Sequence, residues 1–332
     1  MNTDLCALFD SLVLPRELPT GRSLSAVALP DAENYRLAKD TNGAPCLLLR
    51  QPPSATRSAP IRLQNLVVSY EVPCVVSHAD GQREEGTFTI VKCAGADPSL
   101  FPHFLRILSP VIASLGIQPT AAAIRRAING LVDLFQSLTA PAKKSVQGLW
   151  AELLLMRRAS DPRTLIRAWH ALPYEHVDFV SGRQRLEVKS SGNRQRKHYF
   201  SLDQLTPPAN TRLFVASLFV ESVGGGLSLR RLFDETRDLI ASDPSLLTRL
   251  DAAFYATLGS NWNDAMEESF DEELASQSLQ FFDSTKIPRI QGPIHPAIGD
   301  VRFASDLSGT PPETPETIRL AGGLFAAVLP PG

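Results

Sequence analysis

Cysteine is scarce in this chain and poorly placed for metal or redox chemistry. The 332 residues include four cysteines, all in the first third, with no C-x-x-C pair and no histidines at zinc-ligand spacing beside them. These absences argue against a structural zinc and against a thiol redox motif. We therefore expect buried free thiols at Cys6, Cys46, Cys74 and Cys93.

Long apolar runs are also absent. No segment reaches the roughly 18 consecutive apolar residues of a membrane span, and the N-terminal stretch lacks the basic start and apolar core of a signal peptide. The sequence therefore predicts a cytoplasmic protein with no membrane contact. The triplet Gly224, Gly225 and Gly226 belongs to neither a P-loop nor a G-x-G-x-x-G pattern, so we expect no nucleotide cofactor.

Charge of one sign is not in excess. The chain has 33 basic and 35 acidic residues, a net charge of −2, so the whole molecule is no obvious binder of polyanions. Any contact with nucleic acid must come from a local patch. The segment 183–197 is such a patch, because it has one acid, Glu187, among six basic residues, which are Arg183, Arg185, Lys189, Arg194, Arg196 and Lys197.

What the chain does have is a β-rich start followed by helices. Apolar residues make up 43% of the chain, and its length exceeds that of a typical single domain. Short β-branched runs between turn residues predict a small sheet or sandwich before residue 97. We expect a β-rich N-terminal domain over 1–97, a helical connection over 98–140, an α/β domain over 141–310 and a peripheral Pro-rich segment over 311–332.

The most informative stretch, YEHVDFVSGRQRLEVKSS, is typical of a β-hairpin. Its two β-prone runs flank a polar turn, and a two-residue loop with glycine at its first position favours a type II′ turn. In that register Ser181 faces Gln184, and Asp178 lies opposite Glu187 on the same face. Lys189 shares that face, because strand side chains repeat with period two.

Carboxylates held opposite each other repel, so something must offset the charge of Asp178 and Glu187. A hard divalent cation would do so, and Mg²⁺ typically takes one or two carboxylates together with water and phosphate oxygens. Protonated Lys189 is no ligand, but it suits orienting the attacking water and countering charge on a phosphate. The three residues predict a metal-dependent nuclease centre, and the alternative is a surface hairpin with solvated charges.

A further carboxylate lies upstream, on a helix predicted from about Lys144 to Arg158. Leu149, Leu155 and Met156 are neighbours of Glu152 at helical spacing, which places this acid on an apolar side of the helix. A buried ionised carboxylate needs a partner or a metal, so Glu152 is a third candidate ligand. The alternative is that it lies at the edge of the apolar stripe and pairs with Arg157 or Arg158.

With this helix included, the chain resembles the PD-(D/E)XK nuclease superfamily, whose fold is the restriction-endonuclease-like fold. There a helix with a glutamate precedes a hairpin that carries an aspartate and then E-x-K, and the matching residues here are Glu152, Asp178, Glu187 and Lys189. The runs GLWAELLLM, LEVKSS, SLDQL and IPRI also look similar to bacterial members of formerly unknown function, found near defence and restriction systems. One departure is Val177, which stands where the motif has proline.

The resemblance implies an α/β fold with a mixed sheet flanked by helices, preceded here by the smaller β-rich N-terminal domain. It implies Mg²⁺, with Mn²⁺ as a substitute, held by Asp178, Glu187 and Glu152, and it implies that Gln204 supports the site near the scissile phosphate. DNA is the expected substrate, and a homodimer or other defence-system subunits are the expected partners. The alternative function is a non-catalytic DNA-binding or scaffold subunit with the same fold.

Several residues after the E-x-K motif are candidates for binding DNA. Ser190 and Ser191 either bond a phosphate or finish the strand. The next basic residues are expected in a loop that enters a helix, where they would neutralise phosphates without reading sequence, unless the loop is only a solvated one. These residues are Arg194, Arg196, Lys197 and His198.

Overall fold

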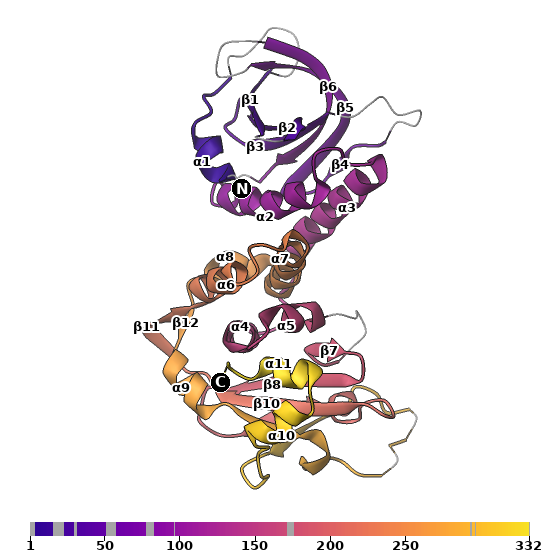
Figure 1. Cartoon of the computed structure of the whole chain (residues 1–332), viewed down its shortest axis with the longest axis vertical. Helices are drawn as coiled ribbons and strands as arrows, with labels where there is room; N and C mark the ends of the chain where they lie inside the picture. The colour runs from indigo at the N-terminus through magenta and orange to yellow at the C-terminus, as the bar shows by residue number, and fades with distance from the viewer. Residues whose placement is uncertain are drawn as a thin grey trace. The chain divides into compact units, whose positions relative to one another are not determined.

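We describe the fold from a computed structural model of the chain (Figure 1). The structure describes residues 4–15, 23–29, 32–50, 58–77, 83–95, 97–170, 176–292, 294–295 and 297–331. Within it the chain divides into two compact units, Met1–Ala140 and Pro141–Gly332. Each has its own core.

The first unit is built around one six-stranded sheet. The strand order is β1-β2-β3-β6-β5-β4, and β1 also pairs with β5, so the sheet closes on itself, as the ring of strands in Figure 1 shows. Apolar side chains such as Leu48, Val76 and Phe88 form a buried cluster of the sheet. The strands are β1 (Ser23–Leu29), β2 (Ala32–Lys39), β3 (Pro45–Arg50), β4 (Ile61–Arg62), β5 (Leu66–Ser77) and β6 (Arg83–Cys93).

Helices belong to the same unit. They are α1 (Leu5–Asp10), α2 (Leu100–Leu115) and α3 (Ala121–Ser137). Thr120 caps α3, since its hydroxyl accepts a hydrogen bond from the Ala123 amide at 3.2 Å. The cysteines are free thiols, and Cys46, Cys74 and Cys93 are buried, whereas Cys6 is half-buried.

The second unit is organised on a mixed sheet of four strands in the order β13-β10-β8-β7. The hairpin strands β7 and β8 are antiparallel, β10 runs parallel to β8, and β13 is antiparallel to β10. In the parallel register Val215 is the partner of Glu187, and Ser217 is the partner of Lys189. The strands are β7 (Phe179–Ser181), β8 (Gln184–Ser191), β10 (Arg212–Phe219) and β13 (Gln280–Asp283).

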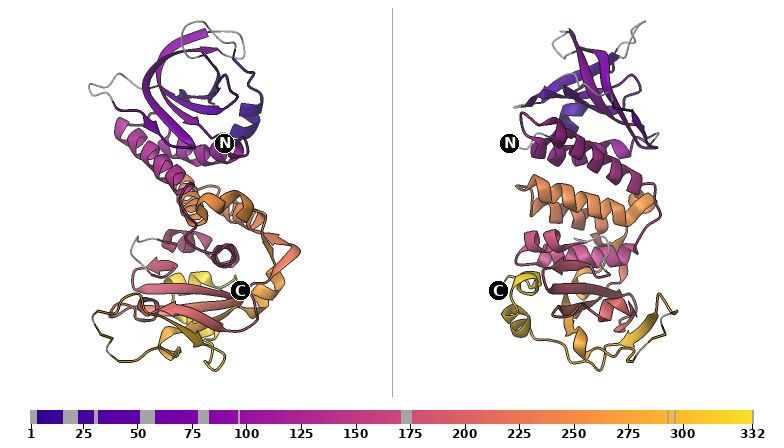
Figure 2. Two further views of the ribbon diagram at one scale, coloured as in Figure 1. Left: turned by 180° about the vertical axis from the view of Figure 1, so that it is seen from behind. Right: turned by 90° about the vertical axis from the view of Figure 1, so that its right-hand side faces the viewer.

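Both faces of this sheet are covered, as its apolar strand β10 predicts. On one face α4 (Val146–Arg158) and α11 (Gly323–Val328) contact β8, and Phe214 packs on Phe325 with ring centroids 4.5 Å apart. Figure 2 shows α4 and α5 (Pro162–Ala168) as a layer beside the sheet. On the other face Leu213 and Val215 share a core with Phe200 of β9 (Lys197–Ser201), which pairs with β14 (Arg302–Asp306).

The remaining helices and strands lie around this framework. Helices α6 and α7 contact α4, and α7 also contacts α5. The elements are η1 (Asp203–Leu205), β11 (Ser222–Ser228), α6 (Leu229–Asp238), α7 (Pro244–Leu258), η2 (Gly259–Asn261), α8 (Trp262–Ala265), β12 (Ser269–Phe270), α9 (Glu272–Ser278), η3 (Ser284–Lys286) and α10 (Pro315–Leu320).

The expectation of a peripheral C-terminal segment is wrong. Proline at the start of α10 takes a position where a helix needs no backbone donor, so it begins that helix instead of breaking it. The following helix α11 buries Leu324 and Phe325 against β8, α4 and α5. No helix in the described ranges is long and apolar enough to cross a bilayer.

Candidate active site

The hairpin that carries the site has the predicted register. Ser181 pairs with Gln184, and the ladder continues to the pair of Phe179 and Leu186. Gly182 has a φ of 57° while Arg183 is not left-handed, which is the pattern of a type II′ turn. The ladder ends one step before Asp178, so this acid lies at the open end of the hairpin.

Asp178 is fixed by contacts on both sides and is 4% exposed. Its backbone oxygen accepts a hydrogen bond from the His170 amide at 2.9 Å, and its Oδ2 accepts one from the Val188 amide at 2.8 Å. Its Oδ1 accepts a hydrogen bond from the Lys144 ammonium. The carboxylate therefore has a backbone donor on one oxygen and a cation on the other.

Glu152 lies on the buried side of α4 and is 2% exposed. Its Oε1 accepts a hydrogen bond from Lys144 Nζ at 2.7 Å, and its Oε2 accepts one from Trp169 Nε1 at 2.6 Å. His170 Nε2 lies 3.4 Å from the same Oε2. A lysine, an indole and an imidazole thus surround one buried carboxylate.

The two alternative readings of these acids are wrong. Glu152 does not pair with Arg157, whose guanidinium binds Glu235 and Glu272 instead. The hairpin charges are not solvated either, because Asp178 is buried and Glu187 is 3% exposed.

Glu187, Lys189 and Gln204 form a hydrogen-bonded triangle. Lys189 Nζ lies 2.9 Å from Glu187 Oε1 and donates to Gln204 Oε1 at 3.1 Å. The Gln204 amide nitrogen closes the triangle by donating to Glu187 Oε1 at 2.6 Å. Gln204 also donates to the backbone oxygen of His176 and accepts from the Ser201 amide, so η1 holds this side chain firmly.

The charges of the three buried acids are unevenly compensated. Burial raises the pKa of Glu187 to about 8, with help from the negative charge of Asp178. Burial and Glu152 likewise raise the pKa of Asp178. Burial opposes ionisation of Glu152 too, but the Lys144 charge and the bond to His170 outweigh it and lower the pKa of Glu152. Negative charge is therefore in excess around Asp178 and Glu187, which a cation would relieve.

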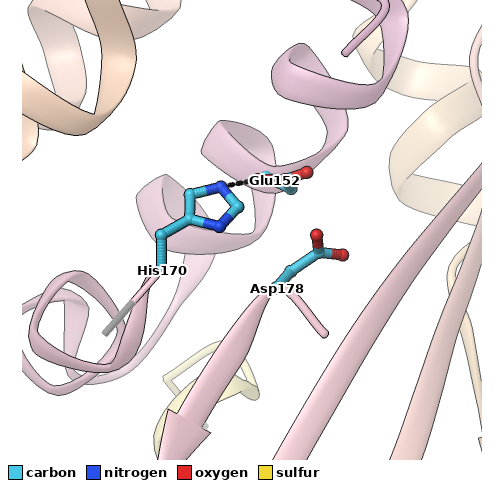
Figure 3. A group of neighbouring side chains, drawn as sticks. All are labelled: Glu152, His170 and Asp178. Carbon is cyan, nitrogen blue, oxygen red and sulfur yellow. Dashed lines mark ion pairs between the residues drawn. The ribbon is translucent and has the colours of Figure 1, made fainter. Parts of the chain in front are cut away.

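The residues fit a divalent cation. Glu152, His170 and Asp178 each offer one ligand atom, and these atoms all lie within 4.8 Å of one another (Figure 3). Glu187 Oε2 is buried and has no hydrogen-bond partner among the residues that the structure describes. Carboxylate oxygens are the ligands that hard divalent ions prefer. Of the three predicted ligands, Glu152 and Asp178 belong to this group, whereas Glu187 lies outside it and His170 takes the third place.

The chain matches, over residues 7–308, the model of a family described as "Putative PD-(D/E)XK family member, (DUF4420)". The chain belongs to this family. Members of the PD-(D/E)XK superfamily are mostly nucleases, and their folds usually use divalent metals. The mixed sheet with its helices is compatible with that fold. Neither the curated proteins nor the solved structures include a match to this chain.

Val177 stands where the PD-(D/E)XK motif has proline. Val177 is 6% exposed and shares a core with Val180 and Leu205. The side chain before Asp178 is therefore part of the core, and Asp178 itself belongs to the candidate ligand group.

Two residues of this candidate site, Lys144 and His170, are not predicted by sequence motifs. Lys144 precedes the N-cap Ser145, and its ammonium binds Glu152 in the second turn of α4. Three carboxylates raise the pKa of Lys144 above its usual range although burial opposes them. The sequence feature that could have indicated Lys144 is the pair of lysines just before a helix with a buried glutamate.

The site lines a cavity of about 1260 Å³ within the second unit. Glu152, Asp178, Glu187, Lys189 and Gln204 all line it. Its wall also includes residues of the β9–β14 ribbon, and three of these are exposed, namely Lys197, Tyr199 and Arg302.

Among the predicted DNA-binding residues, the two serines end the strand. Ser191 is buried and its hydroxyl donates to Asn193 Oδ1 at 2.7 Å, while Ser190 Oγ accepts a hydrogen bond from Gln147 Nε2 at 3.0 Å. Ser190 still lines the cavity.

The expected loop at the basic residues is wrong in part, because Lys197 and His198 begin strand β9. Arg194 is exposed and makes two bonds to Glu221, at 2.6 and 2.9 Å. Arg196 is turned inward, where its guanidinium donates to backbone oxygens of Ser217 and Ser278. His198 is 3% exposed. Of the four, Lys197 is the one that presents an exposed charge to the cavity.

Proposed function

We propose that this protein is a Mg²⁺-dependent DNA endonuclease that hydrolyses phosphodiester bonds, with Mn²⁺ as a substitute metal. One observation supports this most strongly. Glu152 from α4, Asp178 before β7, Glu187 and Lys189 from β8 and Gln204 from η1 meet in one cavity, in the chain order of a PD-(D/E)XK motif. The similarity to proteins near defence systems supports a role in restriction or phage defence.

Asp178, Glu187 and Glu152 would hold the metal ion. When bound, the ion would polarise a phosphoryl oxygen and lower the pKa of a water molecule. Two of the chain's own features favour such binding, which are the uncompensated charge around Asp178 and the buried Glu187 oxygen without a partner in the described ranges.

Lys189 would position the attacking water and counter negative charge on the phosphate. Its ammonium is held by Glu187 Oε1 and Gln204 Oε1 and lies over the Phe200 ring, with Nζ 4.9 Å from the ring centroid. A cation fixed in this way needs no reorganisation when charge develops on the phosphorus oxygens, which is the condition for strong transition-state stabilisation. The water oxygen forms the new bond to phosphorus while the bond to the leaving oxygen breaks.

The rim of the cavity supports a nucleic-acid substrate. Lys197 and Tyr199 are exposed on one side of β9, and Arg302 of β14 is exposed on the same ribbon. Cations beside an exposed aromatic ring are what a phosphate backbone and an unstacked base require.

The test is a cleavage assay on plasmid, linear and modified DNA with Mg²⁺. We expect Lys189→Ala to lower the cleavage rate by at least about 100-fold, with unchanged folding and most DNA binding retained. Glu187→Ala should abolish cleavage. Lys286→Ala is the matched control, because Lys286 is half-exposed and pairs with Glu313 outside the cavity. Undiminished cleavage by Lys189→Ala would contradict the proposed nuclease site.

Cleavage of both DNA strands would need two such centres, so we also propose a homodimer or an assembly with other defence-system subunits on DNA. Light scattering of the protein with a DNA duplex measures the mass directly. A complex with a single copy of the chain would contradict this part of the proposal.

One observation favours a second candidate function, a non-catalytic DNA-binding or scaffold subunit. Lys144 places its ammonium against both Glu152 and Asp178, which are two of the proposed metal ligands. If that ion pair were permanent, the site would bind no metal. The same assay separates the two functions, because DNA binding without cleavage in Mg²⁺ or Mn²⁺ would support the scaffold.

A further inference from the structure

His170 has an unusual backbone conformation at the wall of the cavity. It follows α5 and its C-cap Trp169, and its φ is 43°, in the left-handed region that non-glycine residues rarely adopt. Such a conformation costs free energy and persists only where surrounding contacts enforce it, and such residues cluster at functional sites.

Two hydrogen bonds hold the peptide group that joins Trp169 to His170. The His170 amide donates to the Asp178 backbone oxygen at 2.9 Å. The preceding carbonyl, that of Trp169, accepts a hydrogen bond from Arg249 Nη2 at 2.8 Å, and Arg249 Nε binds the carbonyl of Ile166 at 3.0 Å. These bonds fix the peptide group from which the imidazole of His170 extends into the site.

The imidazole of His170 points to the carboxylates. Figure 3 shows the His170 ring directed toward Glu152, with Asp178 on the neighbouring segment. The three ligand atoms lie within 4.8 Å of one another. Ligands about 2.1 Å from one ion lie at most about 4.2 Å apart, so small side-chain movements would allow all three to share one ion.

We propose that His170 is a direct ligand of the metal ion in this site, together with Glu152 and Asp178, and that the site therefore binds Mn²⁺ more tightly than Mg²⁺. Mg²⁺ takes oxygen ligands almost exclusively. Transition-metal ions also accept imidazole nitrogen, and Mn²⁺ keeps the preference for carboxylate and water oxygens. A ligand set of two carboxylates and one imidazole thus favours Mn²⁺. The inference rests on the proposed function in taking this ion as the nuclease cofactor.

Lys144 occupies the position between two of the proposed metal ligands. Its ammonium now contacts Glu152 Oε1 and Asp178 Oδ1, the same two side chains. A divalent ion bound by both carboxylates has to displace this contact, and Lys144, with about a third of its side chain exposed, has room to turn outward.

The test measures metal binding on the full chain after removal of metals with a chelator. Calorimetric titrations with Mn²⁺ and with Mg²⁺ give both affinities, and electron spin-echo spectroscopy of the Mn²⁺ complex detects a coordinated imidazole nitrogen. The variants are His170→Asn and His170→Gly, since both replacement residues tolerate positive φ. His176→Asn is the matched control, because His176 lines the same cavity and its side chain is 61% exposed.

We expect the wild type to bind Mn²⁺ at least about tenfold more tightly than Mg²⁺. Loss of the ligand should weaken Mn²⁺ binding by about 10- to 100-fold, leave Mg²⁺ binding within about threefold, and remove the nitrogen signal. His176→Asn should change none of these. Circular dichroism and the melting temperature without metal report whether either His170 variant is folded.

The outcomes separate this inference from the proposed function. If both folded His170 variants keep the Mn²⁺ preference, or if the wild-type complex shows no nitrogen signal, the inference is overturned even where DNA is cleaved. If Mn²⁺ binds with the nitrogen signal but no DNA is cleaved, the metal site stands and the nuclease proposal fails. If neither metal binds to the wild type, both are overturned.

Discussion

Lys144 supplies the positive charge between Glu152 and Asp178, so its removal should have opposite effects on the metal-free and metal-bound protein. Breaking a buried pair by removing one partner costs about 3–5 kcal/mol, and we expect a loss near the lower end for Lys144→Met without metal. The vacated contact should also strengthen Mn²⁺ binding. Melting temperatures with chelator and with Mn²⁺ measure both effects.

The neighbouring Lys143 provides the control for this prediction. Lys143 lines the same cavity, and its backbone amide donates to the Thr257 backbone oxygen at 2.9 Å, a bond that a side-chain substitution leaves in place. Lys143→Met should therefore behave as the wild type. An increase in melting temperature with Mn²⁺ that is no larger for Lys144→Met than for Lys143→Met would contradict the assigned role.

Among single residues of the site, the sequence predicts those that lie close together along the chain. Glu187 and Lys189 are two residues apart on one strand, and Asp178 is related to them by a turn that glycine specifies. Lys144 and His170 escape prediction because their roles depend on tertiary contacts. The role of His170 requires a left-handed backbone that Arg249, from the distant helix α7, holds through the carbonyl of Trp169.

A buried histidine should make the protein sensitive to acid. Ser217 Oγ accepts a hydrogen bond from Arg196 at 2.8 Å, so its own hydrogen is left for His198 Nε2, 2.7 Å away. This arrangement suits a neutral ring, and burial, with the charges of Lys189 and Arg196, lowers the pKa of His198 to about 4 although Asp306 opposes them.

The sign of the pH effect follows from that lowered pKa. The unfolded chain takes up a proton near pH 6.5, whereas the folded protein does so near pH 4, so stability is lost as pH falls through this window, by about 1.4 kcal/mol per unit. The free energy of unfolding in urea should fall less steeply from pH 6.5 to 4 in His198→Gln. His295→Gln, in an exposed loop, is the control, and equal slopes in all three proteins would contradict the prediction.

At the scale of elements, the β9–β14 ribbon gives the cavity an exposed rim. Buried and exposed side chains alternate along β9, so Phe200 enters the core while Tyr199 is 73% exposed and lines the cavity. An exposed ring of this size suits stacking on an unpaired base, which contributes about 1–3 kcal/mol. Tyr199→Ala should therefore weaken binding of single-stranded DNA by about 5- to 150-fold, as measured by fluorescence anisotropy.

The matched variant for this prediction is Tyr199→Phe, which keeps the ring and loses the hydroxyl. It should bind single-stranded DNA within about twofold of the wild type if stacking is the interaction. Equal affinities for Tyr199→Ala and Tyr199→Phe would show that the ring takes no part. Binding is measured in the Glu187→Ala background, so that cleavage does not change the DNA.

The elements differ in how well the sequence predicts them. The hairpin and the strand β10 follow from alternation and apolar runs, and α3 begins at the cap that Thr120 provides. The C-terminal helices escape prediction because Pro315 at the start of α10, and Gly322 and Gly323 at the start of α11, look like helix breakers in a sequence. In α11, Phe325 is buried against Phe214, which lies more than a hundred residues away.

At the scale of the whole molecule, every residue of the site falls within the second unit. Pro141–Gly332 includes the cavity, both halves of the hairpin and the helices that cover the sheet. The unit also has its own core, in which Trp150, Trp169 and Phe214 are fully buried. A core of this kind is what a domain needs to fold alone.

We therefore expect a fragment of residues 141–332 to fold and to bind Mn²⁺ within about threefold of the affinity of the full chain. Mass action then predicts that Mn²⁺ at 100 times its dissociation constant stabilises the fragment by about 2.7 kcal/mol. The same fragment with Glu152→Gln and Asp178→Asn should show no such gain, because it lacks two of the proposed carboxylate ligands. A folded fragment that has lost Mn²⁺ binding would mean that residues 1–140 contribute to the metal site.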